Sequence, residues 1–360
     1  MNNKITVIIP TYERRRYIAR SLAFWSIYPV DLLIVDGSGS PSVEPKVYEA
    51  YENCKYFHLP ISPEKRVHFA ATRVVTPYAI IISDDEFLSY AALQDAVDVL
   101  ETEPEVAAVL GETLAFKIYA GDLVWRRIYH TACELNITAK SPQARMTQRF
   151  QYTDNSIFNP LIRSDILRLA GQYLSDHQYT CPYVAEYQME ALLCSAGSVR
   201  VLPRLMWFRS LEGNMVTTKQ HDREKLFHSW AKDSKNQKEV DRLVKSSSEF
   251  LGMAASTPPA VTGLEFVEMI VREEQRSFAS PEGDTTDSFA RRLYSKLPVV
   301  MRECIRNIYY LLNRRTPEGF MPIVSALKEL NALGIGFDLQ EISRIEKLIS
   351  EGLRFHIRTP

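Results

Sequence analysis

The stretch AIIISDDEF at residues 79–87 decides how the rest of the chain is interpreted. Its apolar half predicts a strand that is buried on both faces. Asp84, Asp85 and Glu86 follow where that strand must end, and burying adjacent charges costs several kcal/mol unless something compensates them. A divalent cation would remove this cost, and oxygen ligands suit Mg²⁺ or Mn²⁺ that bridges a diphosphate. A solvated acidic turn is the alternative for the triplet taken alone.

Size and composition limit the classes of function that the chain can have. With 360 residues it fits one large and one small domain, and a net charge of -1 argues against a nucleic-acid partner. The five cysteines are scattered and lack CxxC spacing, which is typical of a reducing compartment and makes zinc a poor candidate. Because the chain also has no apolar signal region and no long apolar run, we expect a cytoplasmic protein.

Strand and helix patterns alternate through the first half of the chain. Thr11 is expected to cap the first helix, and Gly197 to close a later one. Strands are expected at 5–9, 31–35, 55–59, 79–82, 106–111, 113–119 and 198–202, and helices at 64–76, 90–101 and 185–196. This alternation predicts an α/β fold, with a mostly parallel sheet flanked by helices.

Polar groups follow several of these strands directly. Residues 10–12 come after the first strand, Asp36 after the second, and the acidic run at 84–86 after the fourth. Ligands bind at the carboxyl ends of the strands in such a sheet, so these groups are expected to converge on one binding site.

The character of the chain changes after about residue 222. Residues 223–250 are charged and helix-prone, 279–286 look like a linker, and 287–313 and 318–354 have helical spacing. We therefore expect a sheet domain over 1–222 and a smaller α-helical C-terminal region over 223–360.

Three motifs in order resemble those of a known family. Residues 8–14 (IIPTYER) resemble the opening of GT-A fold glycosyltransferases related to family 2, VDGS at 35–38 resembles their "DDGS" element, and 76–87 is similar to the "TPY…DDDF" run of a bacterial subgroup. The resemblance covers roughly residues 4–215. It implies a GT-A (Rossmann-like) fold and a nucleotide-sugar donor, with UDP as the first choice.

The resemblance also assigns residues to the nucleotide. The first turn and the second-strand aspartate would hold the base, Asp84 would hold the ribose or a metal-bound water, and Lys65 and Arg73 could approach the diphosphate. Arg66 is expected on a solvated helix face, and Asp36 has a turn-capping role as its alternative. The nucleotide-binding candidates are thus Pro10, Thr11, Tyr12, Arg14, Asp36, Lys65, Arg73 and Asp84.

The metal and the catalytic base follow from the same resemblance. Asp85 and Glu86 would ligate Mn²⁺ or Mg²⁺ in this DXD-like motif, although Glu86 departs from the family's last aspartate, and His221 could complete the site. Counting back from Gly197 places Glu186 at the position of the base, which would take a proton from an acceptor hydroxyl. Glu190, four residues on, and Asp176 are reserve candidates.

Residues 291–315 are basic and amphipathic, with tyrosines between the charges. Such a segment can lie on an anionic membrane, although packing on the catalytic domain or on a second subunit in a homodimer is the alternative. Trp207 and Arg209 could form part of an acceptor wall.

Together these features predict an inverting, metal-dependent glycosyltransferase that acts on a hydroxyl of a bacterial surface glycan or its lipid-linked precursor. Two alternatives stay open. One is a sugar-1-phosphate nucleotidylyltransferase, whose glycine-rich phosphate turn is missing here, and the other is a non-catalytic partner with the same fold in a polysaccharide assembly complex.

Overall fold

The computed structural model describes residues 3–129, 135–151, 157, 159–176, 179–212, 226–256, 258–279 and 319–356. Within these residues, nine strands form one sheet in the order β3-β2-β1-β4-β8-β6-β9-β5, and β7 pairs with β6. The strands are β1 (Ile5–Thr11), β2 (Asp31–Asp36), β3 (Cys54–His58), β4 (Tyr78–Ile81), β5 (Phe87–Leu88), β6 (Val106–Tyr119), β7 (Asp122–Ile128), β8 (Leu161–Arg163) and β9 (Ser198–Ser210).

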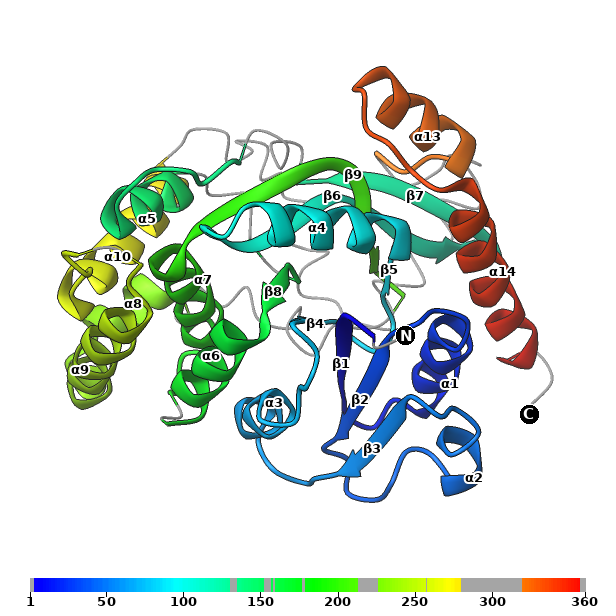
Figure 1. Ribbon diagram of the computed structural model, residues 1–360, viewed down its shortest axis with the longest axis horizontal. Helices are drawn as coiled ribbons and strands as arrows, with labels where there is room; N and C mark the ends of the chain where they lie inside the picture. The colour runs from blue at the N-terminus through cyan, green and yellow to red at the C-terminus, as the bar shows by residue number, and fades with distance from the viewer. Residues whose placement is uncertain are drawn as a thin grey trace, which may run out of the picture.

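The helices cover both faces of this sheet (Figure 1). They are α1 (Arg15–Trp25), α2 (Pro45–Tyr48), α3 (Pro63–Ala71), α4 (Tyr90–Thr102), α5 (Pro142–Phe150), α6 (Ser164–Asp176), α7 (Val184–Ala196), α8 (Phe227–Lys232), α9 (Gln237–Ala254), α10 (Gly263–Ala279), α13 (Ile323–Ala332) and α14 (Leu339–His356), with a short 3₁₀ helix at Ser234–Asn236.

Six of the strands point in the same direction. β3, β2, β1 and β4 are parallel neighbours, and β4 and β6 both run antiparallel to β8, so β6 has the direction of β4. β9 is parallel to β6, whereas β5 and β7 run against their neighbours. The predicted α/β fold with a mostly parallel sheet, flanked by helices and followed by helices, is confirmed.

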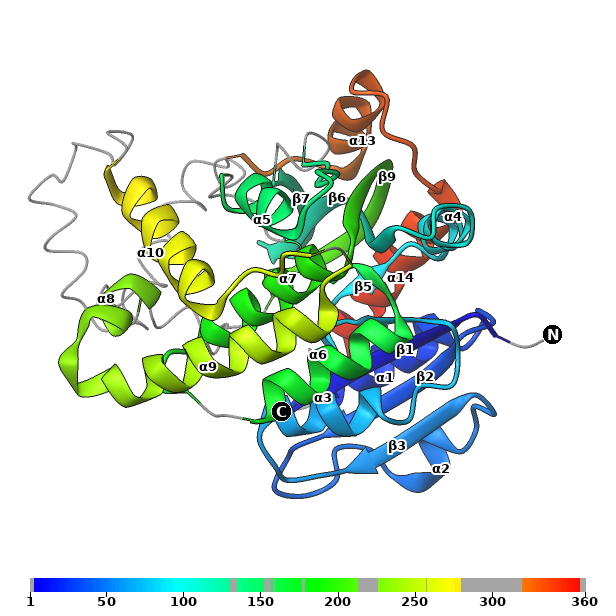
Figure 2. The same ribbon diagram turned by 60° about the vertical axis from the view of Figure 1, so that its left-hand side comes forward.

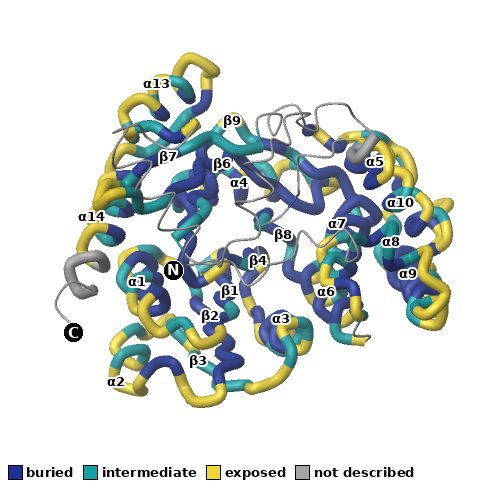
Figure 3. Tube along the Cα trace, turned by 180° about the vertical axis from the view of Figure 1, so that it is seen from behind, coloured by how far each residue is buried: buried dark blue, intermediate teal, exposed yellow. Residues whose placement is uncertain are grey.

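The apolar side chains of β1 and β2 are divided between two hydrophobic cores, one on each face of the sheet. In β1, Val7 and Ile9 belong to one core cluster, while Ile8 between them belongs to the other. In β2, Ile34 and Val35 divide in the same way. Successive side chains of a strand point to opposite faces, so an unbroken apolar run serves two cores. Figure 3 shows the central strands β1 and β2 buried, whereas the edge strand β3 and the outward faces of the helices are more exposed.

The sequence predicts two strands, 106–111 and 113–119, where the structure has one. β6 runs on from Val106 to Tyr119, and its pairing with β9 shifts register on either side of Glu112. At Gly111, a Cβ atom would lie 2.5 Å from the carbonyl oxygen of Arg204. The glycine therefore marks a close approach of two strands within a continuous element, and the prediction of a strand end there is wrong.

The C-terminal helices pack on two opposite sides of the sheet (Figures 1 and 2). α8, α9 and α10 lie with α5, α6 and α7 on one side, whereas α13 contacts β7 and α14 contacts α1 on the other. The helical pattern predicted over 318–354 is confirmed by α13 and α14. The predicted division at 222/223 stays a prediction, and the linker expected over 279–286 lies almost wholly outside the described residues.

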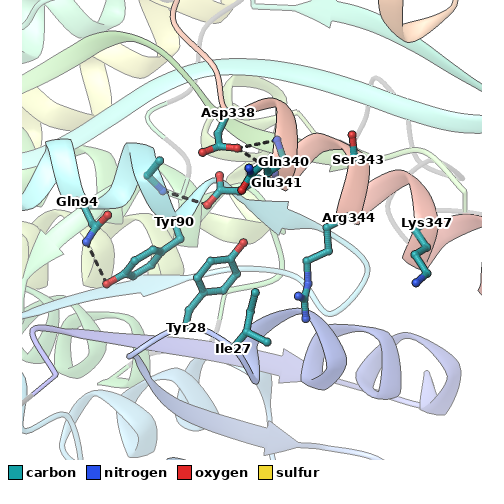
Figure 4. Close-up of a pocket in the computed structure, with 11 residues that line it drawn as sticks. Ile27, Tyr28, Tyr90, Gln94, Asp338, Gln340, Glu341, Ser343, Arg344 and Lys347 are labelled. Carbon is teal, nitrogen blue, oxygen red and sulfur yellow. Dashed lines mark hydrogen bonds between the residues drawn. The ribbon is translucent and has the colours of Figure 1, made fainter.

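Glu341 and Arg344 join α14 to the N-terminal half of the chain. The Glu341 carboxylate accepts hydrogen bonds from the Ser89 hydroxyl and from the backbone N–H of Ala91 at 3.1 Å, and Arg344 donates to the carbonyl of Ala23 at 2.8 Å. Beside them a pocket of about 530 Å³ opens between the ends of α1, α4 and α14 (Figure 4). Two charged residues that line this pocket, Glu341 and Arg344, thus dock α14. In the described part of the chain, no helix has the length and apolarity needed to span a membrane.

Candidate active site

The turn after β1 is fixed by the turn after β2. Glu13 has a φ of 55°, in the left-handed region that only a few non-glycine residues adopt. Its N–H donates to the Ser38 hydroxyl at 2.7 Å, and its carboxylate accepts from the N–H of Gly39 at 2.8 Å. These bonds hold the backbone that presents the next residue, Arg14, to the acidic run.

Thr11 does not cap the following helix, so that prediction is wrong. α1 begins at Arg15, with Arg14 in the N-cap position. The hydroxyl of Thr11 instead donates to the Asp84 carboxylate at 2.5 Å. β1 and β4 are parallel neighbours, which places the residue that ends β1 beside those that follow β4. Of the other two residues in this turn, Pro10 is half-buried and Tyr12 is exposed.

Asp84 and Asp85 share one guanidinium group. Arg14 lies 3.0 Å from an Asp84 oxygen through Nη1, and its Nη2 pairs with an Asp85 oxygen. Both carboxylates are buried, whereas the Arg14 side chain is about one-third exposed. Burial raises the pKa of Asp84 to about 6, although the charge of Arg14 and the bond from Thr11 oppose the rise. The carboxylate oxygens of the two aspartates therefore form one site, and the Arg14 guanidinium lies on its solvent-exposed side.

Glu86 faces a different partner. Its carboxylate accepts a hydrogen bond from the Trp207 indole N–H at 2.9 Å, and the Asn159 amide lies at 3.5 Å. Burial, together with the charge of Asp85, raises the pKa of Glu86 to about 8. The structure thus brings Asp84 together with Asp85, and directs Glu86 toward β9, where Trp207 lies.

Asp36 is fully engaged by the turn that follows β2. One of its oxygens accepts from the N–H of Ser38 at 2.8 Å and from the Ser38 hydroxyl, and the other accepts from the N–H of Ser42 at 2.7 Å and from the Tyr56 hydroxyl. Its pKa is lowered because these bonds outweigh the effect of burial, which opposes them. This set of contacts favours the turn-capping alternative, and the base-binding role stays a prediction.

The basic residues of α3 lie at different places. Arg66 is buried and donates to the backbone carbonyl of Thr11, so its expected position on a solvated face is wrong. At Gly37, a Cβ would lie 2.4 Å from its guanidinium carbon, which explains the glycine there. Lys65 is exposed. Arg73 follows the end of α3, at the edge where β4 begins, and stacks on Phe69 with 3.3 Å to the ring centroid. The structure does not bring Arg73 to the acidic run.

Glu186 and Glu190 lie on α7, which precedes β9 and therefore begins at the carboxyl edge of the sheet. Glu190 is buried, accepts a hydrogen bond from Arg149 at 2.9 Å and accepts the N–H of Ile157 at 3.0 Å. Glu186 is in the first turn and is the exposed member of the pair. Partial desolvation of its carboxyl by the surrounding protein, and then the charge of Glu190, raise its pKa to about 7. Asp176 ends α6 at an exposed position.

Charges of both the acidic run and α7 act on Tyr129. Burial raises its pKa, and the charges of Glu86, Glu186 and Glu190 act on it in the same direction, against Arg209. Its ring stacks on Trp207 with 6.1 Å between centroids, and its hydroxyl accepts from Arg209. The charge of Arg209 also acts on both Glu86 and Glu186. The two groups of carboxylates therefore face one region of the carboxyl edge.

Sequence reasoning missed Arg20 and Glu212. Arg20 donates to the backbone carbonyl of Asp85 at 2.8 Å and to Glu212 at 2.6 Å, and it lies against the rings of Tyr17 and Phe87. Helical spacing from Tyr17 to Arg20 could have placed it on the inner face of α1. Nothing local in the sequence connects it with Glu212, which is 192 residues away.

The oxygen set of Asp84 and Asp85 fits a divalent cation of the Mg²⁺ type, which usually takes one or two carboxylates and completes its shell with water and substrate phosphates. In the described residues, no group of three or more acidic, histidine or cysteine side chains gathers closely enough to hold an ion alone. His221 lies outside the described residues. The two carboxylates therefore fit a divalent cation whose remaining ligands come from a bound phosphate group and water.

No protein-family model matches the chain, and neither does any curated protein sequence. Similar solved structures include S. aureus TarS, with 13% identity and a TM-score of 0.47 over 82% of this chain and 46% of the TarS chain. TarS 1–349 in complex with UDP-GlcNAc has 15% identity and a TM-score of 0.45, over 69% of this chain and 71% of that chain. The complex with UDP has 12% identity and a TM-score of 0.46, over 83% and 77%. A likeness this weak carries no conclusion about activity.

Proposed function

We propose that the chain is a metal-dependent, inverting glycosyltransferase that moves a sugar from a nucleotide diphosphate onto an acceptor hydroxyl. The observation that carries the proposal is the convergence of two carboxylate groups on one sheet edge, with different partners and different pKa values. Asp84 and Asp85 are ion-paired, whereas Glu186 is accessible and has a pKa of about 7. Separate binding and proton-accepting carboxylates are what this reaction needs.

Asp84 and Asp85, rather than the pair Asp85 and Glu86 that the resemblance implied, would hold a divalent cation, because Glu86 is directed toward Trp207. The cation would neutralise the charge that develops on the leaving diphosphate. Glu186 removes the proton from the acceptor hydroxyl. As the acceptor oxygen bonds to the anomeric carbon, the bond from that carbon to the donor phosphate breaks, and the nucleoside diphosphate leaves with the electron pair. Attack and departure on opposite faces in one displacement invert the anomeric configuration.

The reacting sugar would be oriented between the aspartate pair and Glu186 by the side chains of Tyr129, Trp207 and Arg209. The contacts of these three side chains with one another and with Glu86 hold them in a fixed geometry. Such preorganisation lowers the cost of bringing the acceptor hydroxyl to the anomeric carbon. A glycan hydroxyl is the proposed acceptor, and its linkage to a lipid is a further proposal that depends on residues 291–315, outside the described chain.

The test measures binding and turnover with a panel of nucleotide sugars. UDP and UDP-GlcNAc come first, because TarS was crystallised with both. Thermal shift and release of nucleoside diphosphate are measured with Mn²⁺, Mg²⁺ or EDTA, in wild type and in Asp85→Asn. We expect metal-dependent stabilisation and diphosphate release that the variant loses.

The rival functions give different products. Pyrophosphate release from a nucleoside triphosphate and a sugar-1-phosphate would instead establish a nucleotidylyltransferase. Binding of nucleotide sugars with no product over a broad set of glycan acceptors would support a non-catalytic partner. Absence of binding to every nucleotide sugar, with a folded protein, would contradict the proposal.

A further inference from the structure

Arg14 is the cation that neutralises the paired aspartates. Its Nη1 lies 3.0 Å from an Asp84 oxygen and its Nη2 pairs with Asp85. Thr11 donates to the other Asp84 oxygen at 2.5 Å. Two adjacent buried carboxylates repel each other, so a guanidinium that contacts both stabilises their ionised forms. The charge of Arg14 thus does within the protein what a bound cation would do.

Arg20, a second arginine near the paired aspartates, has a different role. Its guanidinium is ion-paired with Glu212 at 2.6 Å, and its hydrogen bond to the acidic run goes to the backbone carbonyl of Asp85. It is about nine-tenths buried and packs against the rings of Tyr17 and Phe87. Arg14, by contrast, is one-third exposed and can reorient without opening the core. Of the two arginines, Arg14 is therefore the one that can leave the carboxylates.

Arg14 and a divalent cation would compete for the same oxygens. A cation at Asp84 and Asp85 must displace Arg14 or accept its repulsion, and either requirement weakens binding of the cation alone. A diphosphate changes this balance, because its oxygens offer the displaced guanidinium a bidentate partner and also complete the shell of the cation.

We propose that Arg14 couples the binding of the divalent cation to the binding of the nucleotide. In the free protein its guanidinium pairs with Asp84 and Asp85, and it moves to the diphosphate when the cation and the nucleotide bind together. This coupling rests on the proposed function. It would keep the carboxylates neutralised in both states. By linkage, the nucleotide must strengthen cation binding by the same factor by which the cation strengthens nucleotide binding.

The test titrates Mn²⁺, followed by electron paramagnetic resonance, with and without UDP. It compares wild type, Arg14→Gln and the control Arg15→Gln. Arg15 carries the same charge one residue away, but its guanidinium donates to the carbonyl of Pro41 at 2.9 Å. Wild type and the control should bind Mn²⁺ weakly alone and at least 10-fold more tightly with UDP. Arg14→Gln should bind Mn²⁺ alone at least 10-fold more tightly than wild type, and UDP should strengthen that binding by a smaller factor than in wild type, because only direct coordination by the diphosphate remains.

The outcomes separate this inference from the proposed function. If Arg14→Gln binds Mn²⁺ as wild type does, or shows the same enhancement by UDP, the coupling role is overturned while metal-dependent transfer can still hold. If wild type binds UDP but Mn²⁺ affinity does not change, the coupling role is also overturned. If wild type binds neither UDP nor any nucleotide sugar, the proposed function itself fails. Circular dichroism of each variant checks that it is folded.

Discussion

Glu186 and Glu190 lie four residues apart on α7, and their surroundings give them different chemistry. Glu190 is tied to Arg149 and to the backbone N–H of Ile157, so its lone pairs are used inside the protein. Glu186 is exposed, with a pKa raised to about 7. A general base works best when its pKa is close to the working pH, which makes Glu186 the better candidate.

Glu186→Gln should lower kcat by about 10²–10⁴-fold, because the amide cannot accept the acceptor's proton. The KM for the nucleotide sugar should stay within about twofold, since the donor binds through the other carboxylate group. The measurement is diphosphate release with a competent acceptor. Glu249→Gln, a change on the exposed face of α9, serves as the control. A variant with unchanged kcat would exclude Glu186 as the base.

The pH dependence of kcat should report the ionisation of Glu186. The carboxylate form of Glu186 is the active one, so kcat should rise with pH through about 7 and level off above it. Initial rates of diphosphate release between pH 5.5 and 9 give the profile. A flat profile over this range, in a reaction limited by chemistry, would argue for another base.

Glu273 shares Arg149 with Glu190, and burial is the main cause that raises its pKa to about 8. Since the ordinary value is 4.5, the folded state holds this proton more tightly than the unfolded state between the two values. Its contribution to stability must therefore fall as pH rises from about 4.5 to 8. Glu273→Gln removes that loss.

We expect Glu273→Gln to match wild type in unfolding free energy near pH 5 and to exceed it at pH 8. Urea unfolding at both pH values measures the difference, and Arg149 keeps Glu190 as its partner in the variant. A variant that is equally destabilised at both pH values would show that the Glu273 carboxylate stabilises the fold in its ionised form.

At the scale of elements, the sequence predicted the buried strands and the main helices because their periodicity is local. Residues 31–35 and 90–101 became β2 and α4 with small changes at the ends. β5 was missed, since two residues that pair with β9 across the fold leave no periodic pattern. The predicted strand at 198–202 continues to Ser210, because tertiary pairing with β6 extends it.

Replacing either of two glycines by alanine should change the free energy of unfolding, but in opposite directions. At Gly197, after α7, a Cβ would lie 2.4 Å from the carbonyl oxygen of Glu105, so Gly197→Ala should destabilise the fold by about 1–3 kcal/mol. At Gly252, in α9, a Cβ would meet nothing within 4 Å, so Gly252→Ala should stabilise by about 0.5–1 kcal/mol.

Chemical denaturation of both glycine variants beside wild type measures the free energies of unfolding. If Gly197→Ala costs no stability, the close approach between the start of β9 and the residues before β6 is not as described. A loss of stability in Gly252→Ala would show that the α9 backbone has a different conformation at that position.

At the scale of the whole molecule, the sequence predicted that polar groups would meet at one edge of the sheet, and the strand directions bring them there. The partners of those groups could not be predicted, because they come from distant elements. Trp207 on Glu86 and Glu212 on Arg20 are examples. α14 is another, since its contact with α1 joins the two ends of the chain. Pairings of this kind depend on the completed fold.

The most direct test of the central claim maps where a metal–nucleotide complex binds. Fe²⁺ replaces Mn²⁺ in the presence of UDP, ascorbate as reductant and hydrogen peroxide as oxidant, and the backbone cleavages that follow are located by mass spectrometry. The account predicts cleavage within residues 84–86 and 11–14, dependent on UDP and abolished in Asp85→Asn. Cleavage confined to other parts of the chain, or independent of UDP, would contradict it.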